Sequence, residues 1–328
     1  MIELLMPLSI IFEFLTAFAN TCFHTGVIPG ELKVTKMIPI TKIAEPKSLN
    51  DYRPISISAK LMLLLKKLYY NRIQLYLEEK NVLSKYQFGF RKHLNTEMAM
   101  IALTDFLEKN LDQKLFCIVI SLDFRKAFDT VPKELLLEKL KNQYNISVQW
   151  LRDYLTSREQ YVDYDGKVSR RQKTVAGVPQ GSIHGPILFS LLIDDLPKWA
   201  IHSQPGFFAD DYTFAFVGHR SNMENLRCEM NTDLINIIRW SEENMLPLNE
   251  RKTVVLVVSN HHNLEEIKSF SININEVTVY ASAGLKCLEL ILDSELTWKN
   301  HITNLVKKWY MRIRAIYSVR SYLRPGWT

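Results

Sequence analysis

Apolar residues with helical spacing and apolar residues with strand spacing follow one another along this 328-residue chain, with no internal repeat and no low-complexity linker. Over 59–79 and 96–110 they recur every three or four positions, which predicts two amphipathic helices. The run 115–124 is β-branched and aromatic, and it predicts a buried strand. Because helices and strands are mixed throughout, we expect a continuous α+β protein with several lobes.

Turn and capping signals place the next elements. Pro132 suits the first turn of a helix that runs to Lys141, since a missing N–H costs nothing there. The dipeptide Asp165–Gly166 tolerates positive φ and predicts a hairpin over 161–174. The remaining expected elements are a helix over 182–193, a hairpin over 206–216, a helix over 222–243, and two or three strands between 253 and 292.

An apolar run near the start, 4–19, raises the question of a membrane span or a signal peptide. The run is too short to cross a bilayer, it contains Glu13, and no basic residue precedes it. It is therefore interpreted as a buried helix.

The last segment combines an apolar stripe with positive charge. Apolar positions between 302 and 317 are spaced by three and four, which predicts a helix packed on one side. Lys307, Lys308, Arg312 and Arg314 lie largely off this stripe. Such a helix suits a lobe that grips a nucleic-acid duplex, although a solvated helix face has the same pattern.

The charge distribution agrees with a polyanionic partner. The chain carries 41 basic and 35 acidic residues, a net charge of +6. Seven of the basic residues lie in 296–328, which contains no acid, and the rest of the chain has 34 basic against 35 acidic residues. The positive charge is thus local to the C-terminal end.

Composition narrows the class of protein. With 47% apolar and 23% charged residues, the chain is too apolar for intrinsic disorder. The four cysteines are far apart in sequence, so they indicate neither a disulfide framework nor a zinc ribbon. A reducing compartment fits, and with no legible targeting signal we expect a cytoplasmic or nuclear location.

Two adjacent acids, Asp210 and Asp211, lie inside the apolar and aromatic hairpin predicted over 206–216. Neighbouring carboxylates repel each other, so this placement is costly unless a cation neutralises them, and Mg²⁺ prefers such oxygen ligands. Asp123 ends the apolar strand 115–124. Two strands could therefore bring three acids together around two metal ions about 4 Å apart. Taken alone, the pair could equally be a structural turn.

A second acidic pair, Asp194 and Asp195, competes with this interpretation. It ends the helix expected over 182–193 and is followed by Leu196 and Pro197. A solvated helix terminus explains it adequately.

Several ordered blocks resemble the polymerase motifs of reverse transcriptases from non-LTR (LINE-type, jockey-like) retrotransposons. The blocks are KMIPITK, NDYRPISI, QFGFRK, SLDFRKAFDTV, AGVPQGSIHGPILF, FFADDYTF, WSEENMLPLNERKT and LILDSELTWKNHI. Together they extend over roughly 26–302, nearly the whole chain, and their order is far more specific than any single block.

The resemblance implies an RNA-directed DNA polymerase, a nucleotidyltransferase that moves a deoxynucleotide onto a primer 3′-OH. Its partners would be an RNA template, a DNA primer and deoxynucleoside triphosphates, and its cofactor two Mg²⁺ ions, with Mn²⁺ as a substitute. The implied fold is a right hand with fingers, an antiparallel palm sheet and a partial thumb. The implied division is a helical lead-in over 1–34, fingers and palm over 35–262, and the palm end with a partial thumb over 263–328.

The same resemblance assigns residue roles. Asp123, Asp210 and Asp211 become the metal ligands, with the backbone carbonyl of Phe124 as an additional ligand. Phe128 matches the steric gate that excludes a ribose 2′-OH, and core packing is the alternative for this side chain.

Other implied roles lie around the nucleotide. Gly181 and Gly177 allow the backbone to approach the templating base pair, and Gln180 reaches the base pair or the template. Arg53 and Lys42 would hold the triphosphate.

Two further residues have less specific readings. Lys252 is a candidate proton donor to pyrophosphate. Asp129 also fits the family pattern, but it lies where a helix cap is expected and is interpreted as structural.

Three departures from the family pattern raise the alternative of a decayed element copy that binds nucleic acid without catalysis. Phe208 replaces a usual tyrosine, His184 replaces an aliphatic residue, and Glu289 stands where glycine is usual and where positive φ is expected. A metal-dependent phosphodiesterase is a third reading, which the GVPQGS block does not support.

Overall fold

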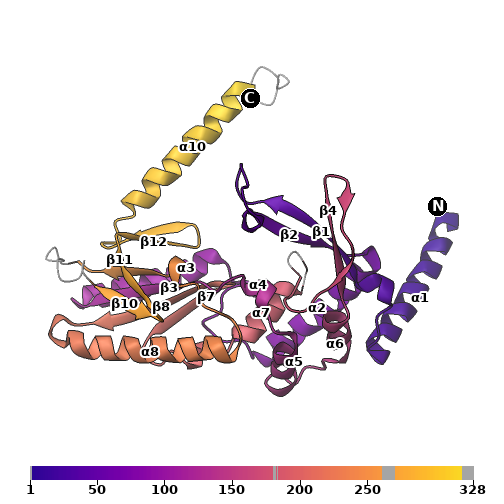
Figure 1. Ribbon diagram of the computed structural model, residues 1–328, viewed down its shortest axis with the longest axis horizontal. Helices are drawn as coiled ribbons and strands as arrows, with labels where there is room; N and C mark the ends of the chain where they lie inside the picture. Colours follow the sequence, from indigo (N-terminus) through magenta and orange to yellow (C-terminus); the bar gives the residue numbers. More distant parts are fainter. Residues whose placement is uncertain (1, 180–181, 183, 261–269, 320–328) are drawn as a thin grey trace. The chain divides into compact units, whose positions relative to one another are not determined.

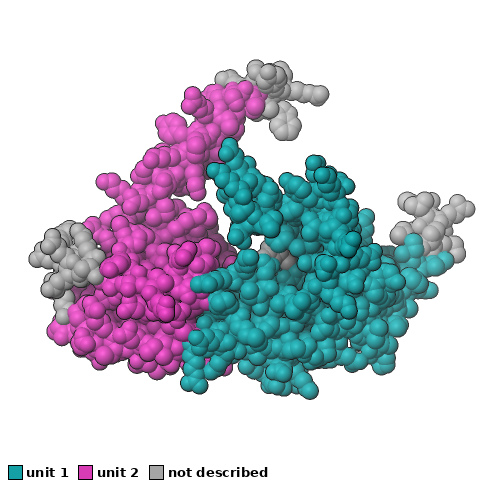
Figure 2. All heavy atoms as spheres, viewed as in Figure 1, with its two compact units in different colours: residues 1–90, 124–197, 239–247 teal, residues 91–123, 198–238, 248–328 magenta. Residues whose placement is uncertain are grey.

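The computed structural model describes residues 2–179, 182, 184–260 and 270–319 (Figure 1). The chain forms two compact units, each assembled from separate stretches of sequence (Figure 2). Unit 1 consists of Met1–Phe90, Phe124–Pro197 and Arg239–Pro247, and unit 2 consists of Arg91–Asp123, Lys198–Ile238 and Leu248–Thr328. Each is described by itself. The division into lead-in, fingers with palm, and thumb stays a prediction.

Unit 1 contains one sheet. Its strands are β1 (Val34–Thr41), β2 (Tyr52–Ile57), β4 (Glu159–Tyr164), β5 (Lys167–Val168) and β6 (Gln172–Lys173). They are ordered β2-β1-β4-β5, and β6 also pairs with β4. β1 is antiparallel to β2 and parallel to β4.

The helices of unit 1 supply most of its core. They are α1 (Ile2–Thr25), α2 (Lys60–Lys80), α4 (Ala127–Thr130), α5 (Lys133–Asn142), α6 (Gln149–Thr156) and α7 (Gly185–Ile193), with the short 3-10 helices η1 (Gly30–Lys33) and η2 (Leu49–Asp51). α7 carries eight buried residues among its nine, so it is the central helix of this unit. α2 buries one face through Leu65, Tyr69, Ile73 and Leu77.

Unit 2 is a six-stranded sheet with helices packed on it. The sheet has the order β10-β11-β9-β3-β8-β7, and β12-β13 forms a separate two-stranded hairpin. This hairpin packs against the sheet through Leu285, Cys287 and Leu292. The strands are β3 (Phe116–Leu122), β7 (Gln204–Phe208), β8 (Asp211–Gly218), β9 (Val254–Val258), β10 (Ser271–Ile274), β11 (Val277–Ser282), β12 (Gly284–Cys287) and β13 (Leu290–Asp293).

Side chains of the central strand β3 point alternately to the two faces of the sheet, so this strand contributes to the core on each face. Cys117 and Val119 on one face join the core formed with α3 (Thr96–Asp112), which presents buried positions from Met100 to Leu111 at spacings of three and four. The remaining helical elements are η3 (Leu196–Lys198), η4 (Arg220–Asn222), η5 (Glu250–Lys252), α8 (Met223–Glu243), which ends in unit 1, and α10 (Lys299–Val319). Strand β3 is thus buried on both sides, as its apolar sequence predicted.

Most predicted elements are confirmed with boundaries shifted by one to three residues. The hairpin at Asp165–Gly166 is present, with both residues at positive φ. The prediction of two or three strands between 253 and 292 is wrong, because β9 to β13 are five short strands. Strands of four to six residues with mixed polarity give too weak a periodicity to be counted from sequence.

The prediction that the run 4–19 is a buried helix is only half right. It does lie in α1, but Ile10, Ile11, Phe12 and Phe14 are exposed. Among the α1 side chains that the structure describes, from 9 onward, the buried ones are Ala19 and Cys22, near its C-terminal end. In the described part of the chain, no helix has the combination of length and apolarity that crossing a bilayer requires.

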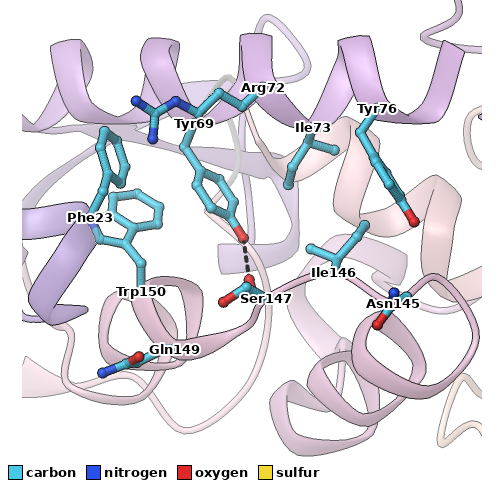
Figure 3. A pocket seen from close by; sticks show the side chains of 10 residues that line it. All are labelled: Phe23, Tyr69, Arg72, Ile73, Tyr76, Asn145, Ile146, Ser147, Gln149 and Trp150. Atoms are coloured by element: carbon cyan, nitrogen blue, oxygen red, sulfur yellow. Dashed lines mark hydrogen bonds between the residues drawn. The ribbon is translucent and has the colours of Figure 1, made fainter. Parts of the chain in front are cut away.

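Aromatic rings from three helices meet beside that end of α1. Phe23 of α1 and Tyr69 of α2 lie 5.4 and 4.6 Å from Trp150 of α6, measured between ring centroids. The Tyr69 hydroxyl donates to the carbonyl of Ser147 at 3.2 Å. These side chains line a cavity of about 290 Å³ (Figure 3). Its lining contains no acid, so it is separate from the acidic site described below.

The prediction of a packed C-terminal helix also needs correction. α10 forms over Lys299–Val319 but has no buried residue, and the stripe that includes Ile302, Trp309 and Ile316 is exposed. Its contacts within unit 2 are made mainly with β13. Lys307, Lys308, Arg312 and Arg314 are exposed as well, so both faces of the helix are accessible.

Candidate active site

The hairpin β7–β8 presents the acidic pair at its turn. Phe208 pairs with Asp211, so Ala209 and Asp210 make the turn between the two strands. Ala209 has φ 59°, a left-handed conformation that closes a tight turn. The flanking residues Phe207 and Tyr212 are fully buried, whereas both aspartates are exposed. Buried aromatic flanks thus anchor a hairpin whose tip carries two carboxylates.

Strand register brings Asp123 to the same end of the sheet. β3 and β8 are antiparallel, and their last pair is Leu122 with Tyr212. Asp123 therefore follows β3 at the edge where the β7–β8 turn lies. The three acids come from segments nearly ninety residues apart and share one end of unit 2.

These acids influence one another electrostatically. Partial desolvation raises the pKa of the Asp211 carboxyl, and the neighbouring charges of Asp210 and Asp123 raise it further. Lys286 acts in the opposite direction. Like charges this close favour the protonated form of one member unless a cation joins them.

Asp123 is held by two polar side chains of unit 2. Its Oδ2 accepts from Asn249 Nδ2 at 3.0 Å and pairs with Lys252 Nζ at 3.0 Å. The Asn249 backbone N–H also donates to the Asp123 carbonyl at 2.7 Å. Lys252, the candidate proton donor, therefore lies directly beside a predicted metal ligand. Asn249 is a positioning residue that the sequence did not single out, although it lies in the motif block 240–253.

The donor chemistry of the three carboxylates fits a hard divalent cation. Within the residues that the structure describes, however, no three His, Cys, Asp or Glu side chains converge closely enough to hold one ion. One reason is that Asp123 Oδ2 points to Lys252 and Asn249. The role of these acids as metal ligands stays a prediction.

The residues predicted to surround the nucleotide belong to unit 1. Phe128 is half-buried and its ring lies 4.7 Å from that of Phe189, so it does pack on the core. Phe124 is buried, with its ring 5.9 Å from Trp240. Arg53 and Lys42 are exposed near the connection between β1 and β2, where Lys42 Nζ donates to the Asn50 carbonyl. Their predicted roles are untested.

The backbone at Gly177, in the motif block 176–189, packs closely against the segment that contains Asp129. Gly177 has φ +85°, and a Cβ on it would lie 2.7 Å from the carbonyl oxygen of Asp129. The neighbouring Val178 N–H donates to the Phe128 carbonyl at 2.8 Å. The motif block 176–189 is thus clamped against the segment that follows Asp123. Gln180 and Gly181 lie outside the described residues.

Two of the predicted structural roles are wrong in detail. Asp129 is no helix cap, because it lies within α4, whose N-cap position is Lys126. Asp194 follows the end of α7 as predicted, but it is buried and accepts from the Ser84 N–H and the Tyr144 hydroxyl. Helix termini that lie inside a core need such partners.

Asp195 belongs to the same buried network. It pairs with Lys139 Nζ at 2.8 Å and accepts from Trp240 Nε1 at 3.0 Å. The pair is therefore not a solvated terminus, and its contacts describe a structural role.

The sequence departures have visible consequences. Glu289 has φ 70°, which confirms that its position favours glycine, and its carboxylate pairs with Lys286 at 2.9 Å. His184 is completely buried among the rings of Tyr69, Trp150 and Tyr154. Within the described residues neither of its ring nitrogens has a well-formed hydrogen bond.

Comparison with known proteins now identifies the class. Residues 43–300 match the family model "Reverse transcriptase (RNA-dependent DNA polymerase)", which is most of the chain. The chain belongs to this reverse transcriptase family.

The relatives point to mobile elements. The chain is 27% identical over 317 residues to the "Probable RNA-directed DNA polymerase from transposon BS" of Drosophila melanogaster, covering 92% of this chain and 34% of that protein. It is 26% identical over 302 residues to the "RNA-directed DNA polymerase from mobile element jockey" of the same species, covering 89% of this chain and 32% of the relative. The assignment to the non-LTR, jockey-like group is confirmed. The chain spans about a third of the length of these relatives.

Solved structures support the fold. The apo telomerase of Candida tropicalis aligns with a TM-score of 0.55 at 14% identity, covering 88% of this chain and 59% of the telomerase truncated from its C-terminal domain. The complex of that telomerase with a fragment of telomeric RNA aligns with a TM-score of 0.53 at 14% identity, covering 88% and 48%. The right-hand polymerase fold predicted from sequence is confirmed. Members of this family generally use divalent metal ions and bind RNA templates.

Proposed function

We propose that this chain is the polymerase core of a retrotransposon-derived enzyme that copies an RNA template into DNA. It transfers deoxynucleotides from their triphosphates to the 3′-OH of a DNA primer, and pyrophosphate leaves. The observation that carries the proposal is that Asp123 and the Asp210–Asp211 turn lie at the same end of the β3–β8 pair. Family membership over residues 43–300 supports the same reaction.

Asp123, Asp210 and Asp211 are proposed to hold two Mg²⁺ ions, with Mn²⁺ as a substitute. Bound divalent ions would supply charge neutralisation at the reacting phosphate. Desolvation, followed by the charges of Asp210 and Asp123, raises the pKa of Asp211, and a bound divalent cation would favour its ionised form.

The chain's own residues orient this site. Asn249 fixes Asp123 through its side chain and its backbone, and both contacts hold the acid at the strand end. Lys252 lies beside the same carboxylate and is proposed to donate a proton to the leaving pyrophosphate. Arg53 and Lys42 are proposed to bind the triphosphate, and Phe128 to exclude ribonucleotides. The basic residues of α10 are proposed to contact the template–primer duplex.

Primer extension on an RNA template in Mg²⁺ tests the function. The wild-type chain should extend the primer, and Asp210→Asn should abolish extension while leaving the melting temperature unchanged. The exposed turn residue Asp165 supplies the control, since Asp165→Asn removes a carboxylate from the hairpin of unit 1. Binding without extension in the wild-type chain would favour a decayed copy, and cleavage of the template would favour a phosphodiesterase.

We also propose a cytoplasmic or nuclear location. Microscopy of the tagged chain tests it, and accumulation in a secretory compartment would contradict it.

A further inference from the structure

A second cavity in unit 1, also of about 290 Å³, has a different lining from the aromatic one. Its walls come from β1 and β2 on one side, including Met37 and Ser56, and from the segment 173–179 on the other. Asp129, Arg158 and Gln160 complete it. Backbone rather than aromatic rings forms much of the surface, because Gly177 and its neighbours lie in the wall. Such a lining suits a polar ligand.

Arg158 is the unusual member of this lining. The residue is only 3% exposed, yet no carboxylate pairs with it among the described residues. Its guanidinium donates to Thr35 Oγ1 at 3.2 Å and lies 5.5 Å from the ring centroid of Tyr154. A guanidinium has five N–H donors, so most of them remain available to a group in the cavity. A buried cation without an anionic partner is costly to keep.

Two further buried lysines increase the positive charge behind this wall. Lys133 is 7% exposed, and its ammonium donates to Thr174 Oγ1 at 3.0 Å, at the cavity edge. Lys66 is 1% exposed and lies on the Tyr154 ring, 5.2 Å from its centroid. Burial lowers the pKa of Lys66 to about 7 and that of Lys133 to about 8, and the charge of Arg158 lowers both further. The basic cluster of Arg158, Lys133 and Lys66 therefore lacks a balancing negative charge in the part of the chain that the structure describes.

The acids nearby do not balance this cluster. Asp129 lines the cavity. Glu159 is the strand partner of Lys173, so this pair adds one charge of each sign at the rim. Arg158 in the lining and the two lysines behind it thus outnumber the one acid of the lining, and this excess favours an anionic ligand.

We propose that this cavity binds one phosphate group of a nucleic-acid strand, with the Arg158 guanidinium as its principal partner. The planar fork of arginine matches two phosphate oxygens at once, which an ammonium cannot do. A single buried guanidinium fits one phosphodiester better than a triphosphate, whose charge calls for several cations in a row. The choice of a nucleic acid as the source rests on the proposed function.

Binding measurements without catalysis test this site. The probes are inorganic phosphate, a short single-stranded RNA without primer, and a deoxynucleoside triphosphate. Phosphate should raise the melting temperature of the wild-type chain, and Arg158→Gln should remove that rise. The same substitution should weaken RNA binding about tenfold and reduce the slope of log affinity against log salt by about 0.7, the value for one phosphate contact on a single strand.

Two variants keep the outcome interpretable. Lys66→Met removes a buried charge that does not line the cavity, so it should weaken the phosphate response less than Arg158→Gln does and should keep the salt slope. If Arg158→Gln does not fold, Arg158→Lys takes its place. This substitution keeps the positive charge but loses the planar guanidinium, so it should bind RNA more weakly than wild type.

The proposal is overturned if Arg158→Gln binds RNA with the wild-type salt slope, or if Arg158→Lys, in its place, binds RNA as tightly as wild type. It is also overturned if the substitution weakens binding of the deoxynucleoside triphosphate and leaves RNA binding unchanged. Because no step requires extension, a chain that binds RNA through Arg158 but never extends a primer would contradict the proposed function and leave this site intact.

Discussion

Lys252 Nζ lies 3.0 Å from Asp123 Oδ2, and Asn249 Nδ2 lies 3.0 Å from the same oxygen. Asp123 is therefore positioned by the block that follows α8, although more than 120 residues separate the two in sequence. The Lys252 side chain is 69% exposed, so this pair contributes little to stability. Its place beside a predicted metal ligand is the basis of its proposed role in the reaction.

Replacing Lys252 tests that role. Lys252→Met should slow single-nucleotide incorporation by roughly a hundredfold, the usual size of a lost proton transfer. The melting temperature should change little, because the side chain is exposed. Rapid-quench kinetics at saturating triphosphate measures the rate. Lys109→Met is the control, since this exposed lysine lies in the last turn of α3 and has no contact with the three acids, all of which the structure describes. Equal rates for wild type and Lys252→Met would rule out the proton-donor role.

The second prediction concerns the clamp at Gly177. Gly177→Ala should cost about 3 kcal/mol of unfolding free energy, because strain at positive φ adds to a clash with the Asp129 carbonyl. Gly166→Ala separates the backbone strain from the clash, because Gly166 also has positive φ but an added Cβ would meet no atom within 4 Å. Gly166→Ala should cost about 1–2 kcal/mol. Urea denaturation measures both. Similar losses for the two variants would show that no clash exists at Gly177.

The third prediction follows from His184. Burial, followed by the charge of Lys66, lowers the pKa of His184 to about 3, and the nearby Lys66 backbone offsets this only in part. The folded state thus keeps the imidazole neutral while the unfolded chain protonates it below its ordinary pKa. Stability is fully present above pH 6.5 and is lost as pH falls toward 3, by at most about 1.4 kcal/mol per pH unit.

His184→Leu should remove this dependence and stabilise the protein at pH 5. Thermal melts between pH 7.5 and 4.5 measure the effect. His24→Gln is the control, because His24 is exposed. If wild type and His184→Leu lost stability equally on acidification, the imidazole would not be the buried neutral group described above.

The fourth prediction concerns discrimination between sugars. Phe128→Val should increase incorporation of ribonucleotides relative to deoxynucleotides by at least about tenfold, because the bulky ring is gone. It should also weaken the packing on Phe189. Phe189→Leu disturbs the same contact without shortening Phe128, so it reports on packing alone. A selectivity change of equal size in both variants would assign Phe128 to the core only.

Much of this fold follows from local sequence patterns. The β3 segment is apolar at nearly every position because the strand is buried on both faces, and its identity is legible for that reason. The hairpin β4–β5 is fixed by Asp165 and Gly166, whose positive φ few other residues accept. Periodicity, in contrast, could not show whether an apolar helix face finds a partner. α10 keeps its stripe exposed, and Ile10, Ile11, Phe12 and Phe14 of α1 are exposed as well.

The candidate site was predictable in part. Asp123, Asp210 and Asp211 stood out because charged residues have no packing reason to interrupt apolar strands. Their convergence at one sheet end depends on the antiparallel register of β3 and β8, a long-range pairing that one sequence does not specify. Arg158 could not be singled out from the sequence. It is one of 41 basic residues, and nothing in the sequence around it indicates that it is buried.

Iron-directed cleavage measures the central claim most directly. Fe²⁺ replaces Mg²⁺ in the complex with template, primer and triphosphate, and peroxide with ascorbate cuts the backbone beside the bound metal. The account predicts cuts at two places distant in sequence, around Asp123 and around Asp210–Asp211, and their loss in Asp210→Asn. Cuts confined to one of these places, or cuts that persist in Asp210→Asn, would contradict it.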